Sequence, residues 1–403
     1  MNSRNVIVFT NTIPRFILDF NHFLRYIARY GFRTTLYAPA TSRETSTWMY
    51  KEEIVADWVE KLPPGSAVRA LPYDRERLSV LDLLRTIVLS RRLAKQDPRA
   101  LVMFWTIVPI IICGLPMRAL GMRCVFMATG LGSAFGSDRF KYRLARPFVK
   151  LVYRYLLRGR NSRTIVHNPE DKEFLSRSLG VKADHIMVTW GCGADPEEFP
   201  YFPDLPRRSK KVILVPSRLM LEKGILEAAE ASRILRERGI EHEMRFTSSI
   251  DSGNPSALRQ QDLDRIEREN DCVKFIGYQP AMAPLYEHCD IVCLPSWYRE
   301  GLPSPLIEAA ACGRPAVACN IIGSREIVED GVTGLMVPPR SAPALADALE
   351  RLIGDDDLAD TLRKNAHRRY LEKFTKDDMV ARTVDVFRSL EADIPRLAAQ
   401  LRG

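Results

Sequence analysis

The amino-acid sequence predicts an α/β protein built from two βα domains in tandem. Short apolar runs alternate with amphipathic stretches in the first half, and the alternation restarts after a Pro-rich and then basic stretch at residues 203–211. This alternation is typical of parallel sheets with crossover helices. The length of 403 residues also exceeds that of one ordinary core, since domains commonly hold about 100–200 residues.

The individual elements follow from the same pattern. In the first half, residues 16–30 read as an amphipathic helix, and strands are predicted at residues 5–10, 32–39, 100–106, 123–129 and 163–168. In the second half, residues 224–239 read as a helix closed by a glycine, and strands are predicted at residues 211–217, 243–249, 272–278, 290–296 and 315–320. The tail from about residue 375 is amphipathic and helical. We therefore expect Rossmann-like domains at residues 1–200 and 201–375, and a C-terminal helix at residues 376–403 that returns to the first domain.

Composition separates the two halves. Hydrophobic residues make up 46% of the chain and charged residues 27%, which excludes wholesale disorder. Residues 1–200 contain 30 Lys and Arg against 18 Asp and Glu, a net charge of +12 in a chain of net charge +9. The remaining residues are thus slightly acidic, and this asymmetry suggests that the halves have different roles.

No segment has the pattern of a membrane span or a metal framework. The longest uncharged run, residues 101–117, falls short of the roughly 20 residues that a spanning helix needs, and we expect a strand followed by a buried helix there. The amino-terminal apolar run is too short for a signal peptide, so a cytoplasmic location is expected. The eight cysteines form no Cys-x-x-Cys pair and sit in apolar surroundings, which predicts buried free thiols.

Residues 294–339 hold one candidate site. A predicted strand ends at Pro295, Glu300 follows in a loop, and a helix begins at Ser304 and Pro305, with serine as the expected N-cap. Glu308 then lies about one turn into the helix. The free N–H groups of Ser304, Leu306 and Ile307 would favour an anionic ligand, and the two carboxylates could reach opposite ends of it. A bare pair of glutamates is more often a solvated or capping pair, but here the strand, loop, helix and next strand occur in order.

A second cluster follows the first strand of the second domain. Arg218 and Lys223 lie in the loop after residues 211–217, beside Gly224. Ligands of open α/β sheets bind outside the carboxyl ends of the strands. A guanidinium fork and an ammonium in such a loop suit a diphosphate, although either cation alone would more often be a solvated surface residue.

The sequence resembles the family 4 retaining glycosyltransferases of the GT-B fold. The resemblance rests on R-x4-K at residues 218–223, EGLPSPLIEAAACGRPAVA at residues 300–318, WGCGADPEEF at residues 190–199 and GSREIVEDGVTGLMVPP at residues 323–339. It covers nearly all of the second domain and, more weakly, the first. It implies two Rossmann-like domains facing across a cleft, with a nucleotide-sugar donor bound by the second domain.

Segments at residues 127–135 and 251–258 also resemble a subgroup. These are bacterial enzymes that extend polyprenyl-diphosphate-linked glycans, including N-acetylgalactosaminyltransferases. The expected activity is transfer of a hexose or N-acetylhexosamine from a UDP-sugar to a polyprenyl-diphosphate-linked saccharide, in the assembly of O-antigen, capsule or glycoprotein glycan. UDP is favoured by this likeness alone.

The resemblance also implies roles for individual residues. Arg218 and Lys223 would hold the donor diphosphate, Glu308 the ribose hydroxyls and Glu300 the hydroxyls of the transferred sugar. The backbone around Gly277 and Tyr278 would face the base. Ser304 and Leu306, at the start of the helix, complete the expected donor site.

Retention is expected by same-face attack, in which the leaving phosphate oxygen takes the acceptor proton. Glu300 as a nucleophile is the less favoured alternative. We expect no metal and no cofactor besides the donor, and interpret Asp262 and Asp264 as part of a solvated helix face. Trp297 and Tyr298 are candidates for contacts at the donor pocket.

Two positions depart from the family pattern. Thr129 stands where many members carry a histidine before the first-domain glycine, and TNTIPRF at residues 10–16 lacks the usual paired glycines. Family roles at these two loops are therefore not carried over to this chain.

Residues 139–163 contain nine Lys and Arg and no acidic residue, interleaved with aromatic and aliphatic side chains. A basic amphipathic helix can lie on anionic lipid, which predicts a peripheral location on the inner face of the plasma membrane. Such charge also suits nucleic acid, although we expect no nucleic-acid partner, and part of the helix should pack in the core. The open alternatives are a GT-B transferase for a soluble acceptor, a nucleotide-sugar epimerase, and a non-catalytic binding module on the same scaffold.

Overall fold

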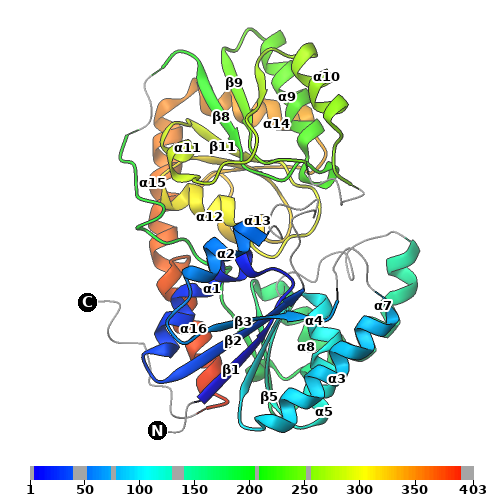
Figure 1. The fold of residues 1–403 in the computed structure, drawn as a ribbon. Helices are drawn as coiled ribbons and strands as arrows, with labels where there is room; N and C mark the ends of the chain where they lie inside the picture. The colour runs from blue at the N-terminus through cyan, green and yellow to red at the C-terminus, as the bar shows by residue number, and fades with distance from the viewer. Residues whose placement is uncertain are drawn as a thin grey trace. The chain divides into compact units, whose positions relative to one another are not determined.

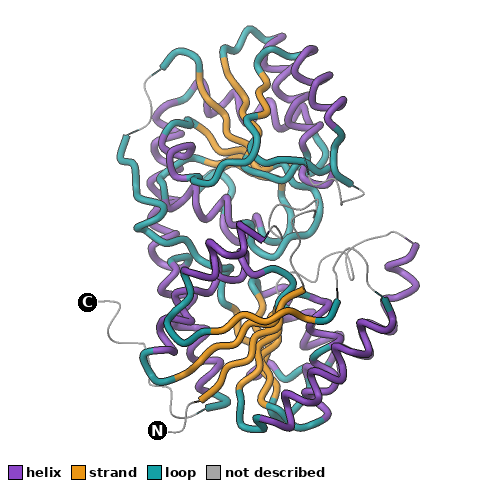
Figure 2. The backbone as a smooth tube through the Cα atoms, in the orientation of Figure 1, coloured by secondary structure: helices purple, strands orange, loops and turns teal. Residues whose placement is uncertain are grey.

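The computed structural model describes residues 4–39, 52–73, 79–128, 140–204, 208–250 and 256–391. It divides into two compact units: unit 1 is residues 1–192 with 377–403, and unit 2 is residues 193–376. Figure 1 gives the elements of each unit, and Figure 2 shows the strands of each sheet in orange. Some predicted features lie outside the described residues, namely Thr129 with residues 130–135, residues 251–255, residues 205–207 of the linker, and Arg139.

Unit 1 contains a seven-stranded sheet in the order β3-β2-β1-β4-β5-β6-β7, and every strand pair is parallel. The strands are β1 (Arg4–Phe9), β2 (Phe32–Pro39), β3 (Ala67–Leu71), β4 (Leu101–Trp105), β5 (Arg123–Met127), β6 (Ser162–Val166) and β7 (Ile186–Val188). The central strands read as continuous apolar runs because both faces of the sheet are covered. In β1, for example, Val6 and Val8 belong to one core cluster and Ile7 and Phe9 to the other.

The helices of unit 1 cover the two faces of its sheet. They are α1 (Ile13–Ala28), α2 (Glu52–Glu60), α3 (Val80–Gln96), α4 (Ile107–Ile112), α5 (Gly114–Ala119), α7 (Phe140–Leu157), α8 (Pro169–Leu179) and the C-terminal α16 (Lys376–Arg388). Helices α1 and α16 lie side by side (Figure 1), with the Phe23 and Phe387 rings 4.8 Å apart. Met379, Val380 and Val384 are buried in the same core. Helix α16 therefore completes the core of unit 1.

Unit 2 contains a six-stranded parallel sheet in the order β10-β9-β8-β11-β12-β13. Its strands are β8 (Lys211–Val215), β9 (His242–Phe246), β10 (Val273–Phe275), β11 (Ile291–Leu294), β12 (Ala316–Cys319) and β13 (Leu335–Val337). Its helices are α9 (Ile225–Glu237), α10 (Gln260–Glu269), α11 (Ala283–Glu287), α12 (Ser304–Ala311), α13 (Ser324–Ile327), α14 (Ala342–Gly354) and α15 (Asp356–Lys373). Each unit is thus a Rossmann-like βα domain, as predicted.

Most of the predicted strands are confirmed, and three short strands were missed. Strand β3, with the sequence AVRAL, has two exposed and two half-buried residues, and β7 and β13 have three residues each. They lie at sheet edges, where few side chains are buried and the apolar signal is weak. The prediction of a single helix after β4 is wrong, because the segment forms two short helices, α4 and α5, which meet at Cys113.

The expectation for cysteine is confirmed. All eight thiols are free, and every one except Cys272 is buried. Burial raises the pKa of Cys113 to about 12, so this thiol is un-ionised and packs as an apolar group. Among the described residues, no helix is both long enough and apolar enough to cross a bilayer.

Candidate functional site

Two loops of unit 2 meet where the strand order reverses. Strand β8 lies between β9, which follows it in the chain, and β11, which comes three strands later. A crevice at this switch point, outside the carboxyl ends of the strands, is the usual ligand site of an open α/β sheet. The loop after β8 carries Arg218 and Lys223, and the loop after β11 carries Glu300. Two predicted site loops are therefore neighbours.

Lys223 and Glu300, which are 77 residues apart in the chain, form an ion pair. The Lys223 Nζ lies 2.8 Å from the Glu300 Oε2, and each side chain is only 11% exposed. The second carboxylate oxygen of Glu300, Oε1, is buried without a hydrogen-bond partner in the described structure. A buried carboxylate oxygen without a partner is costly. The pair is therefore a candidate for rearrangement when a ligand with hydroxyl or phosphate groups arrives.

Close packing at Gly224 joins the two loops. Gly224 has a φ of +72°, and a Cβ built on it would lie 2.1 Å from the Pro295 carbonyl oxygen. The backbone N–H of Trp297 donates to the Glu222 carbonyl oxygen at 3.1 Å, and the Ser256 hydroxyl donates to the Glu222 carboxylate at 2.7 Å. Only a glycine tolerates both this backbone conformation and this approach. The packing holds Lys223 beside the loop after β11.

Arg218 is exposed, unlike Lys223. Its side chain forms no hydrogen bond or ion pair with the residues that the structure describes. The ring of Tyr298 adds a further contact for the buried cation, with the Lys223 Nζ 5.3 Å from its centroid. The loop after β8 thus presents one paired and one unpaired cation, a combination that suits an anionic ligand.

The start of α12 differs from the prediction. Ser304 is the first helical residue, and Pro303 is the N-cap, with a φ of −73° and a ψ of 111°. The fixed φ of proline suits this extended position, so the carbonyl of Pro303 accepts the first bond of the helix. The Leu306 N–H donates to that oxygen at 3.1 Å. The prediction that the Leu306 N–H is free for a ligand is therefore wrong.

Glu308 is positioned by a tyrosine that sequence reasoning missed. The Tyr286 hydroxyl, on α11, donates to the Glu308 Oε2 at 2.7 Å and lies 3.3 Å from the Pro305 carbonyl oxygen. Tyr286 is completely buried, and burial, followed by the charge of Glu308, raises its pKa well above the usual value. The phenol therefore stays protonated and keeps donating to the carboxylate. No sequence pattern pairs two residues 22 positions apart on different helices.

The predicted base-binding segment follows β10. Gly277 has a φ of +71°, and its carbonyl oxygen accepts from the Ser248 N–H at 2.8 Å. A Cβ at Gly277 would meet no atom within 4 Å, so the glycine serves backbone conformation and not packing. Tyr278 is 44% exposed. Their role in binding a base stays a prediction.

Trp297 and Asp262 complete the comparison with the predicted residues. The Arg340 guanidinium lies 3.8 Å from the centroid of the Trp297 ring. The sequence did not predict this contact. Asp262 accepts from the Arg259 N–H at 3.0 Å, so it caps α10, and Asp264 accepts from Gln260 at 2.7 Å. Both aspartates thus have helix-surface roles, and no cluster of possible metal ligands occurs among the described residues.

Unit 1 contains a buried polar cluster at the carboxyl ends of β1 and β6. His167 and Asp19 are 6% and 3% exposed, and Asp19 pairs with Arg15 at 3.1 Å. Burial lowers the pKa of His167 to about 4, with Asp19 opposing and Arg15 adding to the shift. His167 is therefore neutral near pH 7, and its Nε2 has no partner in the described structure.

The basic helix of unit 1 is divided between core and surface. Val152, Tyr153 and Leu156 of α7 are buried. An exposed row runs along the same helix at positions i, i+4, i+7 and i+11, namely Leu144 at 73%, Phe148 at 63%, Leu151 at 65% and Tyr155 at 46%. Helix α3 exposes a second apolar set, Val80, Leu81, Leu84 and Val88, at 54% to 75%. A row of exposed apolar groups along one helix is a candidate interaction surface.

Comparison with known proteins agrees with the sequence motifs that the second half of the chain contains a glycosyltransferase domain. Residues 210–355 match the family model "Glycosyl transferases group 1". The chain is 26% identical over 257 residues to the N,N'-diacetylbacillosaminyl-diphospho-undecaprenol alpha-1,3-N-acetylgalactosaminyltransferase of Campylobacter jejuni, covering 61% of this chain and 65% of that protein. The chain thus spans slightly less than two thirds of this relative.

Two further matches extend over more of the chain. The UDP-Gal:alpha-D-GlcNAc-diphosphoundecaprenol alpha-1,3-galactosyltransferase of Escherichia coli is 25% identical over 81% of this chain and 84% of its own length. The crystal structure of a glycosyltransferase from Rickettsia africae superposes with a TM-score of 0.76 at 16% identity, over 98% of this chain and 100% of that one. The chain therefore contains a glycosyl transferases group 1 domain, at residues 210–355, within a fold of the GT-B type.

Proposed function

We propose that the protein is a retaining glycosyltransferase that moves a sugar from a UDP-sugar to a polyprenyl-diphosphate-linked saccharide in bacterial glycan assembly. The observation that carries the proposal is the Lys223–Glu300 ion pair at the switch point of unit 2, with Arg218 exposed on the same loop as Lys223. The names of the two relatives, both of which act on undecaprenyl-diphosphate-linked sugars, support the acceptor class. UDP-Gal in the second name supports the nucleotide.

In the donor complex, Arg218 and Lys223 hold the diphosphate. Charge stabilisation on the leaving diphosphate lowers the barrier to glycosyl transfer, and fixed cations provide it without reorganisation. The Lys223–Glu300 pair, 2.8 Å apart without ligand, loosens as the diphosphate approaches Lys223. Glu300 then accepts from the sugar hydroxyls, which gives its partnerless Oε1 a donor.

The remaining donor residues bind the nucleoside. Glu308, oriented by the Tyr286 hydroxyl, accepts from the ribose hydroxyls, and the backbone at Gly277 and Tyr278 faces the base. The acceptor oxygen attacks on the same face from which the diphosphate departs, and the leaving phosphate oxygen takes its proton. No metal is needed, because the two cations provide the positive charge.

The test is a donor screen with UDP-, GDP- and ADP-sugars against a synthetic polyprenyl-diphosphate-linked N-acetylhexosamine. We expect transfer from a UDP-sugar with an axial product linkage for an axial donor, assigned by NMR, and unchanged turnover in EDTA. Transfer to a free sugar alone, epimerisation of the donor, or no turnover with any donor would contradict the proposal. Activity abolished by EDTA would contradict its metal-independent form.

The role of Glu300 has a separate test. Glu300→Gln removes the nucleophile but keeps an amide that can bond sugar hydroxyls. We expect roughly a tenfold loss of turnover, because one charge-assisted hydrogen bond is weakened. Complete loss of turnover, together with a trapped glycosyl ester on Glu300 in the wild-type protein, would instead assign the nucleophile role to this residue.

We further propose that α7 attaches unit 1 to anionic membranes. Its exposed row from Leu144 to Tyr155 provides apolar contacts, and the exposed cations Lys150 and Arg154 on the same helix provide attraction worth about 1 kcal/mol each near a charged surface. In a flotation assay with phosphatidylglycerol vesicles, Lys150→Glu with Arg154→Glu should abolish binding. The same charge change at Arg265 and Arg268 of α10 is the matched control, and equal binding by both variants would contradict a role for α7.

A further inference from the structure

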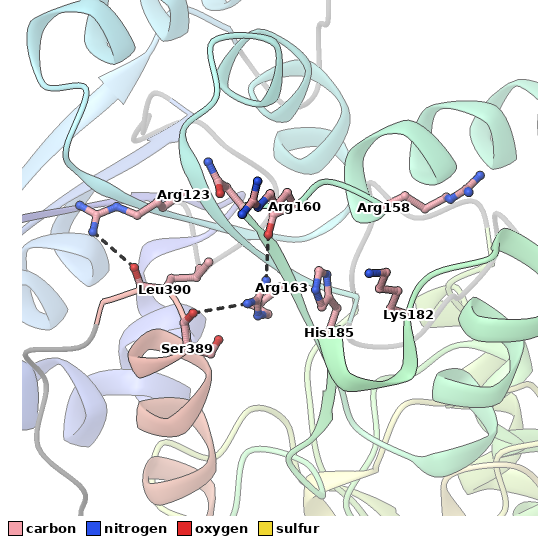
Figure 3. Close-up of a pocket in the computed structure, with 9 residues that line it drawn as sticks. Arg123, Arg158, Arg160, Arg163, Lys182, His185, Ser389 and Leu390 are labelled. Atoms are coloured by element: carbon pink, nitrogen blue, oxygen red, sulfur yellow. Dashed lines mark hydrogen bonds between the residues drawn. The ribbon is translucent and has the colours of Figure 1, made fainter.

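Unit 1 contains a cavity of about 610 Å³ that the proposed function does not use. It is lined by Arg123, Arg158, Arg160, Asn161, Arg163, Lys182, His185, Ser389 and Leu390. Figure 3 shows these residues coming from the starts of β5 and β6, the turn after α7, the segment before β7 and the end of α16. The cavity therefore lies at the amino-terminal edge of the sheet, opposite the edge where ligands of such folds usually bind.

Two of the cavity cations have a structural role. Arg163 donates to the carbonyl oxygens of Arg160 at 3.1 Å and Ser389 at 3.4 Å. Arg123 donates to the Leu390 carbonyl oxygen at 3.4 Å and pairs with Glu391. Cations at the last carbonyls of a helix stabilise its C-terminus. These two arginines therefore fix the end of α16 and need no ligand to explain them.

The other cations have no such explanation. Arg158, Arg160 and Lys182 are exposed and form no ion pair within the described residues. In Figure 3, His185 lies between Arg163 and Lys182. Burial, followed by the charge of Arg163, lowers the pKa of His185, against a smaller opposing effect of Asp184. The cavity lining that the structure describes contains five Arg and Lys side chains and no carboxylate.

The turn that carries Arg158 and Arg160 is held by hydrogen bonds and close packing. In the turn between α7 and β6, the Ser162 hydroxyl donates to the Leu156 carbonyl oxygen at 2.9 Å and the Asn161 amide to the Gly121 carbonyl oxygen at 3.0 Å. A Cβ at Gly159 would lie 2.4 Å from the Ser162 Oγ, so a larger residue would disturb the hydrogen bond that this hydroxyl donates. A fixed turn reduces the ordering cost of binding.

We infer that this cavity binds a phosphate-bearing anion, through Arg160, Lys182 and His185, at a site separate from the donor site of unit 2. Guanidinium and ammonium groups suit phosphate oxygens, the first by a fork and the second as a point charge. The volume fits a small ligand, and the cationic lining disfavours an apolar one. The phosphate can belong to a soluble diphosphate or to a lipid headgroup.

The test measures pyrophosphate binding to the full chain by calorimetry, with saturating UDP present so that the donor site is occupied. We expect Arg160→Ala with Lys182→Ala to weaken binding roughly tenfold. The matched control removes two exposed cations from α10, by Arg265→Ala with Arg268→Ala, and should change affinity by less than about twofold. Equal weakening by both variants, or no weakening by the first, would overturn the proposal.

A pH series gives a second readout. A bound anion raises the pKa of His185, so binding takes up a proton and tightens as pH falls from 8 to 6. His185→Gln should remove this part of the pH dependence, and comparison with wild type cancels the titration of pyrophosphate itself. An identical pH dependence in both proteins would exclude His185 from the site.

Vesicle flotation then distinguishes the two sources of phosphate. If the phosphate is that of a lipid, the Arg160→Ala, Lys182→Ala variant should bind phosphatidylglycerol vesicles more weakly than wild type while the α10 control binds them equally. If it is soluble, the variant should float like wild type and differ only in pyrophosphate affinity. Glycosyl transfer to a soluble acceptor analogue should be unchanged in either case, so this test and the donor screen can fail independently.

Discussion

In unit 2 the buried Lys223 lies 2.8 Å from a Glu300 carboxylate oxygen, whereas in unit 1 burial lowers the pKa of His167 to about 4 and keeps the imidazole neutral. Unit 2 thus holds a cation inside its site by pairing it. Unit 1 keeps Arg158, Arg160 and Lys182 at its surface, unpaired among the described residues. Net charge is +12 in residues 1–200 and −3 in the remainder. The comparison shows that this difference does not predict where the protein binds an anion in a preorganised site.

Lys223→Ala should have the largest effect on activity, because it removes the paired cation of unit 2. We expect glycosyl transfer to fall about a thousandfold, near 4 kcal/mol of transition-state stabilisation, because a preorganised charge at the leaving group is lost. Steady-state kinetics with the best donor measures the loss, and circular dichroism checks that the variant folds. Lys223→Arg should restore part of the rate.

Arg351→Ala is the matched control for this variant, since Arg351 is exposed on α14 in the same unit. Its turnover should equal that of wild type. If Lys223→Ala turned over at the same rate as Arg351→Ala, the diphosphate role of Lys223 would be wrong.

The sequence predicted the parts of the site that depend on chain order. Strands β8 and β11 were found as apolar runs, so the loops with Lys223 and Glu300 fell at carboxyl ends of the same sheet. Their direct pairing could not be predicted, because it depends on how closely Gly224 packs against Pro295. Likewise, Tyr286 lies in an unremarkable helix, and only the fold brings it to Glu308. The exposed apolar residues of α3 were not predicted, because an apolar stripe on a helix is interpreted as core until its neighbours are known. For α7 the sequence predicted both a surface and a core contribution, but not which residues belong to each.

His167→Gln tests whether the buried neutral imidazole of unit 1 makes its stability depend on pH. The folded pKa of about 4 lies below the ordinary histidine value of 6.5, so the unfolded chain binds the proton first as pH falls. Stability from this group is present above pH 6.5 and is lost as pH falls toward 4, by about 3 kcal/mol. Urea unfolding at pH 7 and pH 4 should show that the variant loses less stability than wild type over this interval.

His288→Gln serves as control, because the His288 side chain is 66% exposed and its replacement removes no buried imidazole. Its acid destabilisation should match that of wild type. An unchanged acid loss in His167→Gln would mean that burial of this imidazole does not set the pH dependence of unit 1.

Gly224→Ala tests whether loop packing holds the paired cation. The φ of +72° and the 2.1 Å approach to the Pro295 carbonyl oxygen both oppose a Cβ, and we expect about 2 kcal/mol of destabilisation. Thermal unfolding should show a lower midpoint, and donor affinity should fall because Lys223 moves. Gly239→Ala, at a φ of +76° with no atom within 4 Å, bears the conformational cost alone and should be milder. Equal effects would show that the contact with Pro295 is unimportant.

Tyr286→Phe makes the smallest change, since it removes one hydroxyl and leaves the buried ring in place. Glu308 then loses the donor at 2.7 Å that orients its Oε2. We expect the Kd for UDP to rise roughly tenfold, about 1.4 kcal/mol, with little change in kcat, because Tyr286 acts on ribose binding through Glu308. Tyr370→Phe removes a comparable buried hydroxyl, which donates to the Ala194 carbonyl oxygen at 3.1 Å, and should leave UDP affinity unchanged. If both variants destabilise unit 2 equally and neither alters UDP binding, the tyrosine supports only the fold, and the orientation of Glu308 does not depend on it.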